Sequence, residues 1–169
     1  MRLNKVKPIE KVAKLVKSAK EEGKNVSLVT GCFDILHIGH IKMFRYAKKI
    51  SDIVVVGLEN PDNIRISKGE GRPIHKFNER AEALSEFVSV DLIFKVKEIV
   101  DFGSRDADKI YQSIYERVKP NFIITSQHFD KFWNNKKRNA KEIGAKLVLY
   151  RENRPISSTK IVEQLQREF

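Results

Sequence analysis

The stretch Gly31-Cys32-Phe33-Asp34-Ile35-Leu36-His37-Ile38-Gly39-His40 decides the fold, because it turns a strand into a helix. It follows a strand-like run over residues 25–30, and apolar residues then recur at helical spacing from about His37 to Ile50. In an α/β sheet, such a junction lies at the carboxyl end of a strand, where ligands usually bind. The first turn of the new helix presents unpaired N–H groups and a positive dipole. The stretch therefore predicts a site for an anion such as phosphate.

Helical and strand-like segments alternate along the rest of the chain and are joined by short connectors. Strands are expected at 53–56, 92–96, 122–125 and 146–150; helices at 78–88, 106–118, 131–143 and from Ser157 or Ser158 to Arg167; and a polar loop at 59–76. Five strands separated by helices predict an α/β fold, with a doubly wound, mostly parallel sheet and helices on both faces.

Length and charge indicate the number of domains and the kind of partner. The chain has 169 residues, of which 41% are hydrophobic, and we expect a single domain over 1–169 with an amphipathic helix at about 8–22 docked on it. The formal net charge of +11 favours anionic partners. Lysines fill the polar side of the first helix. Because no aromatic residues lie between them, they indicate a solvated face in preference to a nucleic-acid surface.

Two further features bear on location and redox chemistry. No apolar run approaches the roughly 20 residues that span a bilayer, and no signal-peptide segment follows the basic N-terminus, so a cytoplasmic protein without membrane contact is expected. Cys32 is the one cysteine in the sequence, which excludes an internal disulfide and a multi-thiolate zinc site.

Two other segments could contact phosphate. Three hydroxyls, Ser157, Ser158 and Thr159, open the last helix, where they could serve equally as a helix cap or as a phosphate cradle. The basic, glycine-containing segment 65–73 is either an exposed turn or a mobile flap that closes Lys68 and Arg72 over phosphates.

These segments resemble the cytidylyltransferase-like nucleotidyltransferase superfamily, marked by GxFDxxHxGH at the first strand-helix turn and an ISSTxI-type motif before the last helix. The nucleotidyl-transfer domain of heptose-phosphate adenylyltransferases is most similar, since its NGCFDxxHxGH and KGxxRP motifs resemble residues 30–40 and 68–73. Glycerol-3-phosphate cytidylyltransferase is also similar, and its ISTTKI motif matches 156–161 with one change. The segments 59–62 and 126–130 differ from the corresponding segments of the heptose family. We therefore expect these segments to determine which acceptor is bound.

The resemblance implies a Rossmann-like fold and the transfer of a nucleoside monophosphate from a nucleoside triphosphate to a phosphorylated acceptor, with release of pyrophosphate. It implies that His37, His40 and Lys68 are catalytic and that Arg72 and Arg80 contact acceptor or phosphate. Asp34 would fix the turn by accepting backbone N–H groups. Mg²⁺ would be held mainly by the nucleotide and not by protein ligands. The implied nucleotide-binding residues are Gly31, Cys32, Phe33, Asp34, Gly39, Ser126, Arg154, Ser157, Ser158 and Thr159.

Several alternatives stay open at the level of sequence. The nucleotide is ATP or CTP, and the expected acceptor is a sugar phosphate or polyol phosphate. There are three alternatives: a cytidylyltransferase acting on glycerol 3-phosphate or a phospho-alcohol, an FAD synthetase-like adenylyltransferase, and a non-catalytic, basic nucleic-acid-binding protein. The intact motifs disfavour the last of these. Relatives are commonly dimers, so a homodimer is expected. A nucleotide-binding dehydrogenase is disfavoured, since no GxGxxG follows a strand.

Overall fold

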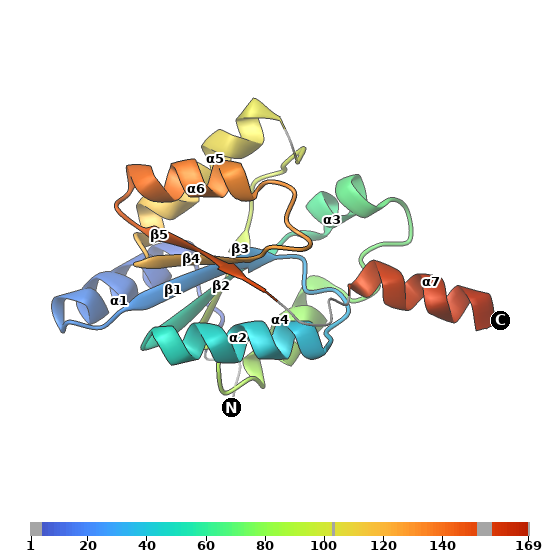
Figure 1. The fold of residues 1–169 in the computed structure, drawn as a ribbon, viewed down its shortest axis with the longest axis horizontal. Coiled ribbons are helices and arrows are strands. Elements are labelled where there is room, and N and C mark those ends of the chain that lie inside the picture. Colours follow the sequence, from blue (N-terminus) through green and yellow to red (C-terminus); the bar gives the residue numbers. More distant parts are fainter. Residues whose placement is uncertain (1–4, 103, 152–156, 169) are drawn as a thin grey trace.

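The fold is built on five parallel strands in the order β3-β2-β1-β4-β5, with helices on both faces (Figure 1). The computed structural model describes residues 5–102, 104–151 and 157–168. The strands are β1 (Val26–Gly31), β2 (Ile53–Glu59), β3 (Leu92–Val96), β4 (Phe122–Ser126) and β5 (Lys146–Tyr150). The helices are α1 (Ile9–Glu21), α2 (Ile38–Ile50), α3 (Pro61–Lys68), α4 (Phe77–Ser85), α5 (Arg105–Val118), α6 (Trp133–Glu142) and α7 (Ser158–Glu168). The predicted doubly wound, five-stranded sheet is confirmed.

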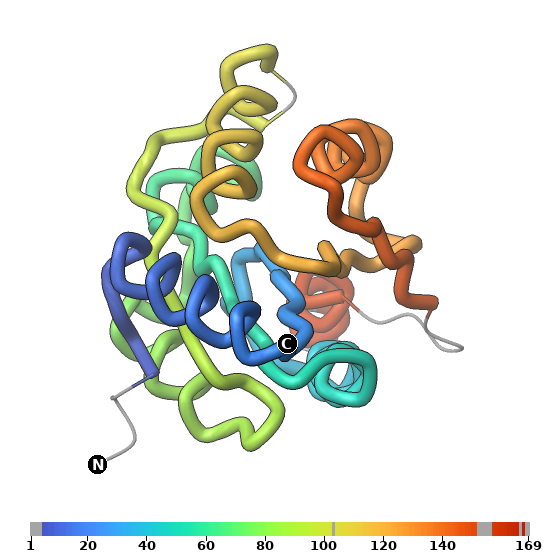
Figure 2. The backbone as a smooth tube through the Cα atoms, turned by 90° about the vertical axis from the view of Figure 1, so that its left-hand side faces the viewer, coloured from blue at the N-terminus to red at the C-terminus, as the bar shows by residue number. Residues whose placement is uncertain are grey.

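Two apolar cores hold the helices on the sheet. Successive strand residues point to opposite faces, so Leu28 and Val55 pack against α1, α5 and α6, whereas Val29 and Val56 pack against α2 and α4. Figures 1 and 2 show α5 and α6 above the sheet and α2 below it. The strands are therefore buried on both faces, which explains their continuous apolar runs.

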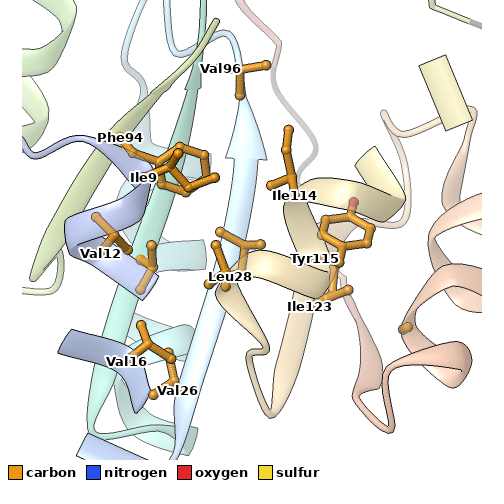
Figure 3. Close-up of a cluster of buried hydrophobic side chains, with 13 residues drawn as sticks. Ile9, Val12, Val16, Val26, Leu28, Phe94, Val96, Ile114, Tyr115 and Ile123 are labelled. Carbon is orange, nitrogen blue, oxygen red and sulfur yellow. The ribbon is translucent and has the colours of Figure 1, made fainter. Parts of the chain in front are cut away.

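The N-terminal helix belongs to the first of these cores. Figure 3 shows Ile9, Val12 and Val16 of α1 turned toward Val26 and Leu28 of β1. The lysines at positions 11, 14, 17 and 20 lie on its exposed side. This amphipathic helix covers the sheet with its apolar stripe and presents its charges to solvent.

One predicted segment is wrong. Residues 59–76 were expected to form a loop, but residues 61–68 form α3, and β2 extends to Glu59. The Asn60 side chain caps α3 by accepting the N–H groups of Asp62 and Asn63 at 2.8 and 3.1 Å, and Pro61 occupies the first turn. Lys68 is thus the last residue of a helix, and the predicted loop begins after it.

The remaining elements agree with the sequence to within their ends. The fourth helix stops at Ser85, before the predicted end at Val88, and α6 begins at Trp133 in place of Lys131. Among the described residues, no helix is both long enough and apolar enough to cross a membrane.

Candidate active site

The candidate site lies where β1 and β4 end side by side. Connections leave these two neighbouring strands toward opposite halves of the sheet, which is the point at which doubly wound folds bind ligands. No side chain caps the first turn of α2, which begins at Ile38 with His37 before it. Its N–H groups face the same edge and favour an anion.

A cavity of about 370 Å³ opens at this edge. It collects most of the residues predicted from the two motifs. The predicted residues that line it are Gly31, Cys32, Phe33, Asp34, His37, Gly39, His40, Lys68, Ser126, Ser157, Ser158 and Thr159. Arg154 lies outside the described residues, and Arg72 and Arg80 do not line the cavity.

The two histidines form one stacked pair at the start of α2. Their ring centroids are 3.8 Å apart with an interplanar angle of 26°. Burial, together with the neighbouring His37 and Lys68, lowers the pKa of His40 to about 3. The His40 ring is therefore neutral at pH 7, so it can donate one N–H to a phosphate oxygen but does not carry a positive charge.

Phe33 packs against the His40 ring of this pair. Its ring meets the His40 ring edge-on, with centroids 5.1 Å apart, and is itself buried. Its backbone φ of 44° lies in a region that residues with a Cβ rarely occupy, which is a form of local strain common at functional sites. A Cβ on Gly31 would lie 3.0 Å from the same ring, so glycine allows the close approach.

Lys68 contacts the second motif directly. The Lys68 Nζ donates to Ser158 Oγ at 3.2 Å, which joins the end of α3 to the start of α7 across the cavity. Ser157 acts as a cap, because its Oγ accepts the N–H of Lys160 at 3.2 Å. The predicted cap is therefore present at Ser157, and Ser158 lines the cavity, where the phosphate cradle stays a prediction.

Asp34 ties the motif to a distant loop. Its carboxylate accepts the N–H groups of Ile74 and His75 at 2.8 and 3.0 Å and pairs with Arg72 Nε at 2.6 Å. It does bind backbone N–H groups, but those of another segment and not of its own turn. Arg72 lies in this buried ion pair outside the first cavity, and its contact with phosphate stays a prediction.

Arg80 is a structural residue. Its side chain is only 1% exposed, and its guanidinium donates to the carbonyl oxygens of Cys32, Glu59 and His75 at 2.7, 3.0 and 3.1 Å. Arg80 thus fixes the ends of β1 and β2 from inside the protein, and its contact with phosphate stays a prediction. Five donors on a planar group suit this task.

Neither a reactive thiolate nor a protein metal centre is found among the described residues. Burial raises the pKa of the Cys32 thiol to about 11, so it is not a thiolate at neutral pH. Among the described residues, no group of three or more His, Cys, Asp or Glu side chains could hold a metal ion. The carboxylates lining the cavity, Asp34 and Asp130, are engaged with Arg72 and Lys136. This arrangement fits a Mg²⁺ held by phosphate oxygens of a nucleotide.

A second cavity, of about 310 Å³, opens beside the first and was not predicted. The two share the end of β1 and the segment after β4, including Asp130. Glu59, Tyr111 and Lys136 are among its further lining residues. Its one indication in the sequence is that segments 59–62 and 126–130, which contribute to its wall, depart from the pattern of the similar families. Tyr111 and Lys136 carried no recognisable motif.

The comparisons with known proteins extend over most of the chain. The model of the family Cytidylyltransferase-like matches residues 28–164. The bifunctional protein HldE of Desulfatibacillum aliphaticivorans is 27% identical over 162 residues, which is 96% of this chain and 31% of that protein. HldE of Sulfurimonas denitrificans is 31% identical over 125 residues, covering 74% of this chain and 24% of that protein. The chain thus spans less than a third of the length of these curated relatives.

Solved structures give the same fold. The lipopolysaccharide core biosynthesis protein from Thermoplasma volcanium is 29% identical, with a TM-score of 0.58 over 79% of this chain and all of that one. Pantothenate synthetase from Thermus thermophilus aligns with a TM-score of 0.62 over 96% of this chain and 70% of that one. At 17% identity, the second likeness speaks for the fold alone.

Proposed function

Because the chain belongs to the cytidylyltransferase-like family, we propose that it moves a nucleoside monophosphate from ATP or CTP to the phosphate of a small organic acceptor and releases pyrophosphate. One observation carries this proposal. His37, His40 and Lys68 line one cavity with Ser158 and Thr159, although the two motifs lie more than a hundred residues apart in the chain. Their donors are suited to a triphosphate.

The reaction requires positioning and charge stabilisation. An oxygen of the acceptor phosphate attacks the α-phosphorus, and the bond from that phosphorus to the bridging oxygen of pyrophosphate breaks, so no covalent enzyme intermediate is needed. His37 and His40 donate hydrogen bonds to oxygens around the α-phosphorus as their negative charge grows. The unpaired N–H groups at the start of α2 stabilise the same charge. Lys68 holds the outer phosphates together with Ser158 and Thr159. A bound Mg²⁺ would neutralise part of the phosphate charge.

The acceptor that we propose is a sugar phosphate or a polyol phosphate. Two similarities support this choice: residues 68–73 resemble the KGxxRP motif of heptose-phosphate adenylyltransferases, and a solved relative is described as a lipopolysaccharide core biosynthesis protein. Glycerol 3-phosphate, a phospho-alcohol or FMN are the competing acceptors. The base of the nucleotide would lie near Ser126 and Arg151, whose side chain donates to that of Gln127.

A matrix of pyrophosphate-release assays tests this function. ATP and CTP are each combined with glucose 1-phosphate, glycerol 3-phosphate, choline phosphate, ethanolamine phosphate and FMN, with and without Mg²⁺. We expect release that depends on both substrates and is lost in His40→Ala. Absence of release with every pair, together with RNA binding that weakens steeply with salt, would instead favour the nucleic-acid-binding alternative.

A further inference from the structure

Helix α3 carries Lys68 into the candidate site but belongs to neither apolar core. Figure 1 shows this helix beyond one end of the sheet, apart from the helices that cover the two faces. Its buried residues are Asn63 and Ile64, and Ile64 is not among the described residues that make up the two cores. The position of α3 therefore depends to a large part on hydrogen bonds.

Asn63 is the buried amide that seats α3 on the rest of the protein. Its Nδ2 donates to Glu59 Oε2 and to the carbonyl oxygen of Glu98, each at 3.0 Å. Its Oδ1 accepts the N–H of Val100 at 2.8 Å. Asn60, at the start of the helix, donates to the same Glu98 oxygen at 3.1 Å. The Asn63 side chain thus uses both of its amide protons and its oxygen to join α3 to the end of β2 and to the segment after β3.

Tyr111 of α5 completes this network through Glu59. Glu59 is the last residue of β2 and is only 2% exposed, and its Oε1 accepts the Tyr111 hydroxyl. Burial raises the pKa of the Glu59 carboxyl group, whereas the hydrogen bonds from Tyr111 and Asn63 oppose this shift because they favour the charged form. A buried carboxylate that lost one of these donors would be costly. Tyr111 therefore fixes the side chain to which Asn63 is bonded.

The helix carries this anchoring to the candidate site. Lys68 follows Asn63 by five residues on α3, so its backbone lies about 7.5 Å further along the helix axis. The Lys68 Nζ is 3.2 Å from Ser158 Oγ in the first cavity. A tilt of α3 at Asn63 would move this ammonium, and a displacement of about 1 Å is enough to impair a group that must meet its ligand in one geometry.

We propose that Tyr111, Glu59 and Asn63 are positioning residues for Lys68, which set the direction from which its ammonium contacts the outer phosphates of the nucleotide. This inference rests on the part of the proposed function that gives Lys68 to the nucleotide. Lys68 lines the first cavity, whereas the three positioning residues are not among its described lining residues. Their effect on the nucleotide must therefore pass through α3.

The test is a double-mutant cycle between Tyr111→Phe and Lys68→Ala. Calorimetry measures the Kd of α,β-methylene ATP and of α,β-methylene CTP without any acceptor. Tyr111→Phe keeps the ring and deletes the hydrogen bond to Glu59, so in the protein with Lys68 the Kd should rise on the order of 3- to 10-fold. In the Lys68→Ala background, the same substitution should change the Kd by less than about twofold, because the group that it positions is absent.

Tyr115→Phe is the matched control, since it deletes a buried tyrosine hydroxyl one turn further along α5 that is not part of this network. It should leave the Kd unchanged in both backgrounds. The inference is overturned if Tyr111→Phe raises the Kd equally with and without Lys68, because a general structural loss does not depend on Lys68, or if it leaves the Kd unchanged. Should Tyr111→Phe not fold, Glu59→Gln, which keeps one acceptor oxygen and loses the other, is measured in the same two backgrounds with the same criteria.

Pyrophosphate release separates this inference from the proposed function. If a methylene nucleotide binds but no acceptor gives pyrophosphate with ATP or CTP, the proposed function fails and the cycle still decides the positioning role. If transfer occurs and Tyr111→Phe raises only the acceptor KM, Tyr111 acts on a ligand of the second cavity, which it lines, and the positioning role alone is refuted. Absence of binding of both methylene nucleotides would overturn the function and the inference together.

Discussion

At the scale of single residues, His40 is a neutral imidazole held in place by its neighbours, which suits the donor role proposed for it. Its Nδ1 is buried without a hydrogen-bond partner among the described residues, its ring stacks on His37, and Phe33 supports it edge-on. These contacts fix the direction of the imidazole before substrate binds. A donor fixed in advance is stronger in a dry site than one that must reorganise.

Replacing His40 by alanine should leave the fold intact and lower kcat on the order of 10²- to 10⁴-fold, which is the range for losing a preorganised donor. Turnover by the pyrophosphate assay and the circular dichroism spectrum are the measurements. His75→Ala removes an exposed imidazole outside the cavity and should keep kcat. Turnover of His40→Ala close to that of the wild type would remove His40 from the mechanism.

The lowered pKa of His40 also makes a prediction about stability. Above pH 6.5 the His40 imidazole is neutral in both the folded and the unfolded protein. Between pH values of about 3 and 6.5, it binds a proton in the unfolded chain but not in the folded protein. The free energy of unfolding should therefore fall as the pH is lowered. Urea titrations at pH 7 and 5 should show a loss up to about 2 kcal/mol larger for wild type than for His40→Gln. Equal losses would mean that the folded-state pKa is not depressed.

Lys68 gives a separate prediction about nucleotide binding. Lys68→Ala removes the donor between α3 and Ser158, so the nucleotide KM should rise on the order of tenfold or more while the fold persists. The matched control is Lys49→Ala, which replaces an exposed lysine at the end of α2. It should change neither the nucleotide KM nor kcat. If the nucleotide KM and kcat of Lys68→Ala equal those of the wild type, the contact with Ser158 is merely structural.

At the scale of elements, the Asp34–Arg72 pair locks the segment before α4 onto the first motif. The Asp34 side chain is fully buried and that of Arg72 is 11% exposed, so Arg72→Ala would leave a buried charge without its partner. Its expected cost is about 3–5 kcal/mol in the free energy of unfolding. Arg65→Ala breaks an exposed pair with Asp62 and should cost about 1 kcal/mol or less. Similar losses for the two variants in urea titrations would show that Arg72 has no locking role.

The elements also show what sequence patterns can and cannot predict. Apolar periodicity found every strand of the sheet, because strands buried on both faces are continuous runs such as residues 53–56. It missed α3, whose mean composition is polar and whose start depends on the Asn60 cap. The burial of Arg72 and Arg80 could not be predicted, because charge alone does not reveal burial and their partners Asp34 and Cys32 are distant in the chain.

At the scale of the whole molecule, the parallel sheet brings two cavities to one edge. The predicted family, Cytidylyltransferase-like, is confirmed. The first cavity collects the motif residues, which the sequence identified by type and spacing. The second depends on Tyr111 and Lys136, which come from α5 and α6 and meet Glu59 only in the folded protein. Acceptor identity was therefore the part that the sequence could not predict.

The central claim is that an oxygen of the acceptor phosphate attacks the α-phosphorus of the nucleotide. The most direct measurement uses glycerol 3-phosphate or glucose 1-phosphate whose phosphate carries ¹⁸O in its terminal positions, with ATP or CTP, and mass spectrometry of both products. The account predicts a nucleoside diphosphate conjugate that retains all of the label and an unlabelled pyrophosphate. Label in pyrophosphate or in free nucleoside monophosphate, or no conjugate with either nucleotide, would contradict it.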